Sequence, residues 1–233
     1  MKTDSLPTAE VKPPKLHWYQ WRLRSLFILT LLVAIGMSWL AVEMRNERRQ
    51  KAAAEAIEKA GGRVESELTW LGKLLRDDSL VRVTYVCLQG QSVTEDVLVR
   101  LRGLSQLQVL CLMNAPVTDA DLVHLQGLSQ LQQLSLSNTK VTDAGLVRLQ
   151  GLSQLRIVTL DRTKITDAGL VYLQGLQQLQ WLLLDRTKVT DAGLVHLQGV
   201  NHLEWVTLTG TKVTDQGVKK LQQALPNCKI AAK

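Results

Sequence analysis

The stretch VTDAGLVRLQGL, residues 141–152, returns almost unchanged 24 residues later at 165–176 and again at 189–200. Working outward from it, the same unit can be aligned six times, and each copy opens on an aliphatic residue: Val83, Leu107, Leu131, Leu155, Leu179 and Leu203. Further apolar residues stand at positions 4 and 6 of every copy, as Leu134 and Leu136 do in the third. A period of this length with an LxxLxL core predicts a solenoid rather than a single globular core.

Each copy changes its periodicity half-way along. Apolar positions 4 and 6 alternate with variable positions 3, 5 and 7, which predicts a short strand. From Thr142, a candidate helix cap followed by Asp143, the leucines recur at helical spacing. One strand and one short helix cannot bury their apolar faces alone, so stacked copies should form an α/β solenoid with a curved parallel sheet inside and helices outside. We expect the glycines that end each helix to be left-handed: Gly127, Gly151, Gly175 and Gly199.

A column of threonines shares position 9 of the repeat. An inward hydroxyl there could satisfy backbone groups of its own turn and of the adjacent coil, which makes the column structural rather than a row of functional groups. The members are Thr139, Thr163, Thr187 and Thr211. The lysines of position 10 form a second column, interpreted as a solvated rim. They are Lys140, Lys164, Lys188 and Lys212.

Taken together, these motifs resemble the leucine-rich repeat family, in the Thr-Asp-Ala-Gly-Leu variety common in bacterial repeat proteins, over residues 83 to about 230. Residues 56–78, with Gly61-Gly62 and Trp70-Leu71, also resemble the segment that precedes such repeats in bacterial membrane-anchored members. The resemblance implies a protein-interaction scaffold without catalytic residues. The first copy departs from the pattern, with Gln91 in place of threonine and Glu95 in place of aspartate, as a coil that meets a cap is expected to do.

The segment before the repeats is divided by composition. Residues 1–24, with three prolines, are predicted to be a disordered tail. Residues 25–42 carry no charge between Arg24 and Glu43, and 18 helical residues span about 27 Å, so we predict one transmembrane helix. A cleaved signal peptide is the alternative, since Ala34-Ile35-Gly36 imitates a cleavage site. Basic residues flank both ends of the run equally, so they do not assign a side of the membrane.

The remaining boundaries follow from charge and apolar spacing. Residues 43–62 are rich in Ala, Glu, Lys and Arg with only a thin apolar stripe, which predicts a solvent-exposed spacer helix ended by Gly61-Gly62. Residues 63–82 are predicted to be an N-terminal cap, in which one face of a short helix covers the first repeat. That face comprises Trp70, Leu71, Leu74 and Leu75. Residues 83–233 form the repeat domain, whose C-terminal cap is a last helix stopped by Pro226 and a closing strand at 227–230.

Chemistry-bearing residues do not converge in this sequence. The net charge of +7 is spread along the chain without a basic stripe of interleaved aromatics, so we expect no nucleic-acid binding. No nucleophile–base pair, phosphate-binding loop or metal-ligand spacing can be assembled, so we expect no catalytic residues, no cofactor, no metal and no small-molecule substrate. Cys87 and Cys111 share position 5 of adjacent copies, where two free thiols are favoured over a disulfide because neighbouring parallel strands rarely offer the bridge geometry.

The inner sheet face presents positions 3, 5 and 7, whose identity the leucine core does not dictate. The fifth and sixth copies place two tryptophans there beside an aliphatic and two charged residues, a composition typical of a protein-binding hot spot. The predicted partner-binding residues are Trp181, Leu183, Asp185, Arg186 and Trp205. The alternative interpretation is that neighbouring side chains cover position 3 and the rings only stack.

Three classes of function are considered for this sequence. The first is a single-pass membrane protein, in the bacterial inner membrane, that binds another protein through its inner face. The second is an envelope structural protein without a specific partner, or a secreted repeat protein after signal cleavage. The third is an enzyme, which would require convergent titratable groups that the sequence does not supply.

Overall fold

The computed structural model describes residues 17–90 and 93–232, with side chains from residue 25 onward. The chain divides into two compact units, the first ending at Arg45 and the second beginning at Asn46, and each is described by itself. Helix α1 (His17–Lys59) contributes residues to both.

The beginning of α1 corrects part of the predicted tail. Residues 1–16 lie outside the described residues, but 17–24, which were assigned to a disordered tail, are helical. The assignment rested on the early prolines, and a proline restricts only itself and the residue before it. After Pro14 the next proline is Pro116, so none of the residues of α1 lacks a backbone donor.

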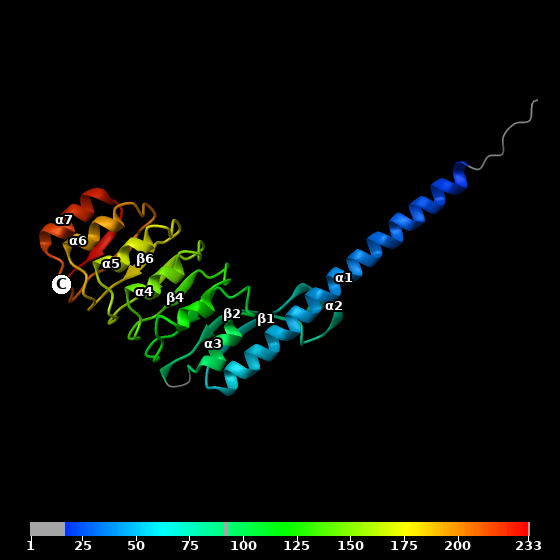
Figure 1. Cartoon of the computed structure of the whole chain (residues 1–233), viewed down its shortest axis with the longest axis horizontal. Helices are drawn as coiled ribbons and strands as arrows, with labels where there is room; N and C mark the ends of the chain where they lie inside the picture. The colour runs from blue at the N-terminus through cyan, green and yellow to red at the C-terminus, as the bar shows by residue number, and fades with distance from the viewer. Residues whose placement is uncertain (1–16, 91–92, 233) are drawn as a thin grey trace, which may run out of the picture. The chain divides into compact units, whose positions relative to one another are not determined.

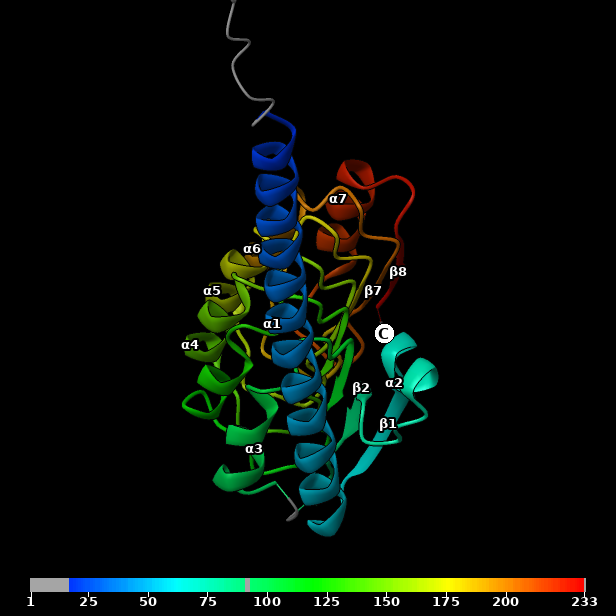
Figure 2. The ribbon, with the colours of Figure 1, turned by 90° about the vertical axis from the view of Figure 1, so that its right-hand side faces the viewer.

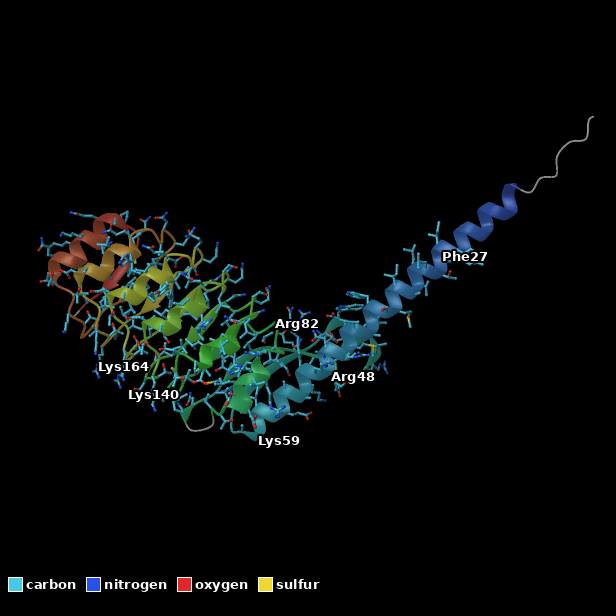
Figure 3. All side chains as sticks on the ribbon, viewed as in Figure 1. Phe27, Arg48, Lys59, Arg82, Lys140 and Lys164 are labelled. Atoms are coloured by element: carbon cyan, nitrogen blue, oxygen red, sulfur yellow. The ribbon has the colours of Figure 1, made fainter. Side chains whose placement is uncertain are left out.

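The first unit contains the apolar part of α1. All the large apolar side chains from Leu26 to Val42 except Leu40 are exposed, with Phe27 at 70% projecting from the helix (Figure 3). Within the part of the chain that the structure describes, α1 is the one helix whose length and composition would allow it to cross a membrane. A signal sequence near an N-terminus would have the same length and composition.

The second unit is built on one eight-stranded sheet whose strands follow chain order. Strands β2 to β8 are parallel and one repeat apart in register, so Trp181 pairs with Trp205, whereas β1 joins β2 antiparallel. The parallel sheet is as predicted; the antiparallel first strand was not foreseen. The strands are β1 (Arg63–Leu68), β2 (Val81–Cys87), β3 (Val109–Cys111), β4 (Gln133–Ser135), β5 (Ile157–Thr159), β6 (Trp181–Leu183), β7 (Trp205–Thr207) and β8 (Lys229–Ala231).

Short helices cover the other face of the solenoid (Figures 1 and 2). The three near-identical copies each form one α-helical turn over Asp-Ala-Gly-Leu that continues as a 3₁₀ turn. The outer segments are α3 (Glu95–Leu101), η2 (Asp121–Leu125), α4 (Asp143–Leu146), η3 (Val147–Leu149), α5 (Asp167–Leu170), η4 (Val171–Leu173), α6 (Asp191–Leu194), η5 (Val195–Leu197) and α7 (Asp215–Ala224).

The core lies between these two layers, as the repeat pattern predicts. Leu160, at position 6 of the fourth coil, is fully buried, and so are the aliphatic residues at positions 1 and 4 of the same coil, Leu155 and Val158. The outer helix contributes Leu170 and Leu173 from the other side. By contrast the position-10 lysines are exposed, and Lys140 and Lys164 project from one edge of the solenoid (Figure 3). The assignment of inward and outward positions is therefore confirmed.

A column of aspartates joins each coil to the next. The Asp143 carboxylate accepts a hydrogen bond from the backbone N–H of Thr166 at 2.8 Å and another from its hydroxyl at 2.6 Å. The same pair of bonds links Asp119 to Thr142, Asp167 to Thr190 and Asp191 to Thr214. The sequence suggested only that these aspartates interact with their own helix end, whereas the structure shows a ladder between coils. Charge-assisted bonds of this kind are among the stronger hydrogen bonds in proteins.

The glycine of Asp-Ala-Gly-Leu is required by this ladder. A Cβ added at Gly145 would lie 2.5 Å from Asp119 Oδ1, and one at Gly169, Gly193 or Gly217 would overlap the carboxylate of the preceding coil in the same way. The second coil has Asp121 at this position, and its carboxylate bonds instead to the N–H and hydroxyl of Thr118 within the same coil, both at 2.7 Å. The ladder therefore begins between the second and third coils.

The turn that follows each strand agrees with expectation in its threonines but differs in where the backbone is left-handed. The position-9 threonines have the predicted structural role. The Thr163 hydroxyl donates a hydrogen bond to Leu160 O, and the equivalent threonines do the same in their own coils. Left-handed backbone, however, occurs at position 8, where Asn138, Arg162 and Arg186 have φ of 56° to 58°. Of the glycines predicted to be left-handed, Gly127 is, with φ 92°, but Gly151, Gly175 and Gly199 are not among the left-handed residues. The chain turns where it leaves the strand, and Arg162 N–H there bonds to Asp185 O of the next coil.

The predicted spacer helix is instead the main N-terminal cap. Four residues of α1 spaced three or four apart, Glu47, Gln50, Ala54 and Ile57, are buried against the first coil. Gln50 Oε1 accepts the N–H of Val83 at 3.0 Å. The prediction of a solvent-exposed helix over 43–62 is therefore wrong. Two of the four buried residues are polar and are buried with hydrogen-bond partners, so the apolar residues alone do not reveal the buried face of the helix.

The short helix expected to form the cap has the opposite role. Helix α2 (Trp70–Leu75) exists and begins at Thr69, whose hydroxyl oxygen accepts from Gly72 N. Only Leu71 of its four large apolar side chains is buried, whereas Trp70, Leu74 and Leu75 are exposed. Since α1 and β1 already cover the first coil, α2 has no apolar edge left to contact. At the other end Leu221 and Leu225 are buried and β8 closes the sheet, as predicted.

The ladder generates a direct test with a matched control. Gly193→Ala inserts a methyl group against the Asp167 carboxylate and should lower the free energy of unfolding by about 1–3 kcal/mol, as overpacking does. Gly175→Ala, where an added Cβ meets nothing within 4 Å, should change it by no more than about 0.5 kcal/mol. Denaturant titration of both variants measures the difference. Equal losses would contradict the requirement for glycine at the ladder.

Candidate functional site

Two tryptophans define the centre of the candidate site. Trp181 on β6 and Trp205 on β7 occupy position 3 of adjacent coils, and the parallel register places them side by side. Their ring centroids are 6.2 Å apart with the planes tilted by 35°, within the range of favourable aromatic pairs. Trp181 is 44% exposed and Trp205 is 38% exposed. The rings stack, as the alternative interpretation proposed, and they also leave apolar surface open to solvent.

The remaining predicted residues differ in how free they are to meet a partner. Leu183 is half-buried at position 5 of β6. Asp185 is half-buried, and its Oδ1 accepts the N–H of Thr209 at 2.7 Å, so part of its bonding capacity serves the next coil. Arg186 is exposed, and its side chain passes Gly210, where an added Cβ would come within 3.2 Å of Arg186 Cγ. All five residues therefore lie on neighbouring coils of one face.

Lys229 is a member of this surface that sequence reasoning missed. Its Nζ lies over the Trp205 ring, 5.8 Å from the centroid, in a cation–π arrangement. From the sequence this lysine was placed in the closing strand at 227–230 and was not assigned to the binding face. A signal was present, however, because Lys229 stands 24 residues after Trp205 and pairs with it in the β7–β8 register. We call the surface formed by Trp181, Leu183, Arg186, Trp205 and Lys229 the tryptophan face.

A polar network borders the tryptophan face on the preceding coils. Thr159 Oγ1 lies 2.7 Å from Ser135 Oγ and accepts the Ser137 hydroxyl at 2.9 Å. Asp161 accepts the backbone N–H of Asp185 at 2.9 Å and the Ser137 hydroxyl at 3.2 Å. Burial raises the pKa of the Asp161 carboxyl, and the neighbouring Asp185 carboxylate raises it further, against the lowering effect of its hydrogen bonds. The inner face thus changes from polar to aromatic along the solenoid.

The cysteine pair lies at the opposite end of the same face. Cys87 and Cys111 are register partners on β2 and β3, and both are free thiols. Burial raises the pKa of the Cys111 thiol to about 11, and a side-chain hydrogen bond with Cys87 contributes to that increase. A thiol that stays protonated at neutral pH is a poor nucleophile and a poor metal ligand. Beside it a shallow hollow is lined by Gly61, Arg63, Tyr85, Cys87 and Gln89.

The acidic side chains near the inner face take part in contacts between coils. Among the described residues no three histidine, cysteine or acidic side chains gather in a way that could hold a metal ion. Where carboxylates occur in columns, the ladder aspartates have both oxygens engaged by a threonine of the next coil. On strands β2 to β8, Trp181 and Trp205 are the large apolar side chains that remain exposed.

Asp161 and Asp191 should change the stability of the protein in opposite directions as pH rises. The folded-state pKa of Asp161 is raised, so its contribution to stability is greatest below the unfolded value of 3.8 and declines as pH rises through the folded pKa. Asp161→Asn removes that titration and keeps an oxygen acceptor. The difference in free energy of unfolding between this variant and the wild type should therefore shift in favour of the variant as pH rises from about 4 to about 7.

Asp191 is the matched control. The hydroxyl and backbone N–H of Thr214 lower its pKa, so its contribution is present above 3.8 and is lost as pH falls through the folded pKa. Asp191→Asn should therefore lose stability relative to the wild type as pH rises toward 3.8, with little further change between about pH 4 and about pH 7. Denaturant titrations at several pH values measure both, and shifts of the same sign would show that Asp161 is not destabilised by burial.

No family model and no curated protein matches this chain. Solved structures of bacterial proteins are similar to it at low identity. An internalin (inlC2) from Listeria monocytogenes is 21% identical with a TM-score of 0.48, covering 67% of this chain and 82% of that one. An internalin (inlF) from the same organism is 21% identical, with a TM-score of 0.42 and coverage of 57% and 43%. An LRR protein of Leptospira interrogans is 19% identical, with a TM-score of 0.43 and coverage of 57% and 38%. The chain thus spans less than half the length of two of these three proteins. At this level of similarity, the coil geometry of the chain itself defines the fold.

Proposed function

We propose that this chain is a membrane-anchored, non-catalytic leucine-rich repeat protein that binds another protein through its inner sheet face. The observation that carries the proposal is the tryptophan face, where two partly exposed rings on adjacent strands are flanked by Arg186 and Lys229. Tryptophan and arginine are enriched among residues that dominate binding energy, and burial of exposed rings contributes roughly 25 cal/mol per Å².

The rigidity of the sheet supports the same proposal. Position 3 of each strand is held by backbone hydrogen bonds to the neighbouring coil, such as Trp205 N–H to Gln180 O at 3.1 Å. A surface that is already ordered loses little conformational freedom on association, which favours affinity. An envelope structural protein without a partner would have no reason to keep two tryptophans together on its solvated face.

Anchoring is the second part of the proposal. The 18-residue run without charge at 25–42 and its exposed apolar side chains favour a single span, which we place in the bacterial inner membrane. The competing interpretation is a secreted repeat protein released after cleavage. The two differ in the mass of the mature chain and in its association with membranes.

The binding proposal is tested by Trp181→Ala combined with Trp205→Ala. If the rings are hot spots worth about 2 kcal/mol or more, affinity for a partner cross-linked in native membranes should fall by about 30-fold or more. The circular dichroism spectrum and melting temperature should stay close to those of the wild type. The control is Val171→Ala with Val195→Ala, two exposed apolar residues of the outer helices, which should leave binding unchanged. If the tryptophan variant unfolds, the rings are core residues. If it folds and still binds, the tryptophan face is not the binding site, and the Tyr85 end of the inner face becomes the next candidate.

The anchoring proposal is tested by alkaline carbonate extraction of membranes from cells that express the full chain. The intact protein should remain in the pellet, because an apolar span of this length is not displaced by loss of ionic contacts. Release of intact protein, or a mature chain that begins near Gly36, would contradict an uncleaved anchor.

A further inference from the structure

Helix α2 presents its apolar side chains to solvent. Trp70 and Leu74 stand one helical turn apart and are 60% and 69% exposed, and Leu75 beside them is 49% exposed. We call these three residues the α2 patch. A surface helix of a soluble domain normally turns such residues inward and its charges outward. Here Lys73 and Arg76 are also exposed, so the outer surface of α2 combines large apolar groups with two positive charges.

The outward orientation of the α2 patch is fixed by the structure around it. Leu71 is buried against the rest of the unit, and the Thr69 hydroxyl oxygen caps the helix by accepting a hydrogen bond from Gly72 N at 3.1 Å. The backbone approaches so closely that a Cβ at Gly72 would lie 2.8 Å from Leu80 O. Helix α2 therefore cannot rotate to bury Trp70 and Leu74 without losing these contacts.

Helix α2 is attached to the part of α1 that follows the apolar run. The Thr69 hydroxyl donates to Glu47 at 3.1 Å, Arg48 forms an ion pair with Asp77 at 3.1 Å, and Lys51 Nζ donates to Asp78 O at 3.1 Å. The Ser79 hydroxyl and backbone N–H, together with Arg48, lower the pKa of Asp77 to about 2, so its charge persists at neutral pH.

The number of residues between the apolar run and this attachment limits how far α2 can be from a membrane. Glu47 follows Val42, the last residue of the uncharged run, by five positions. Even a fully extended chain of five residues spans at most about 18 Å, whatever its direction. If 25–42 cross a bilayer, the base of α2 is held permanently within a short distance of its surface.

We infer that the α2 patch binds the surface of the membrane in which the chain is anchored. This inference rests on the proposed anchoring by residues 25–42. Tryptophan favours the interface between headgroups and acyl chains, and leucine side chains enter the acyl boundary. Lys73 and Arg76 meet the negative potential of an anionic leaflet. A lipid surface is also the one apolar partner that the tether keeps at high local concentration, which favours it over a soluble protein.

Photo-cross-linking of the full chain in vesicles of phosphatidylcholine and phosphatidylglycerol tests the inference. The variant Leu74→p-benzoylphenylalanine tolerates the larger ring because the position is exposed, and mass spectrometry of the adduct distinguishes lipid from a second copy of the chain. Leu31→p-benzoylphenylalanine reports on the span, and Val195→p-benzoylphenylalanine, on an outer turn of the fifth coil, is the exposed control. We expect lipid adducts at positions 31 and 74, with a several-fold lower yield at 195.

The outcomes separate the two proposals. A lipid adduct at 31 with none above the level of 195 at 74, or with a protein adduct at 74, overturns the α2 inference and leaves the anchor standing. No lipid adduct at 31 overturns the anchor and the inference that depends on it. In the Leu74 variant, adding Trp70→Glu should lower the lipid adduct several-fold because it places a carboxylate at the lipid surface; an unchanged yield would show that the contact at 74 does not involve the α2 patch.

Discussion

The fully buried leucines of this protein depend on a neighbour at every coil. Parallel strands stand about 4.8 Å apart, so one strand with its short helix covers only a thin slice of core, and its apolar residues are shielded by the coils on both sides. Leu160 is inaccessible because the third and fifth coils enclose the fourth, not because the fourth folds around it. Stability in such an array is a sum of contacts between neighbours. The backbone bonds of the sheet and the aspartate ladder both serve this single requirement on opposite sides of the core.

The same requirement explains the two ends. At the start, α1 and β1 replace the missing coil: α1 buries Ala54 and Ile57 and satisfies the Val83 N–H through Gln50, while β1 pairs with the free edge of β2. At the C-terminal end, α7 and β8 cover the last coil. The Gln222 amide donates hydrogen bonds to the carbonyls of Leu225, Pro226 and Cys228 and so holds the connecting turn. Both caps use hydrogen bonds from side chains where the repeat would use the next coil.

Much of this could be predicted from residues alone, and the exceptions share a physical cause. The period, the strand, the inward positions and the pairing of Trp181 with Trp205 follow from side-chain alternation and repeat length. The burial of Glu47 and Gln50 could not be predicted, because a polar residue is buried only if a partner is positioned for it, and the partners lie on other elements. Likewise Asp143 meets its threonine 23 residues further on, which helix-end preferences within one coil do not reveal. Lys229 was missed because the closing strand was treated as an edge rather than as a seventh coil.

The departure of the second coil from the ladder has a mechanical consequence. Thr118 bonds to Asp121 of its own coil, so among the described residues the junction between the first and second coils has strand pairing and apolar packing without the carboxylate clamp that every later junction up to Thr214 has. The first coil is fastened to α1 through Gln50 and Val83. Any tension applied between α1 and the far coils must pass through this first junction. Under load the solenoid should therefore separate there first, with the first coil kept on α1 and the other five released as one folded block.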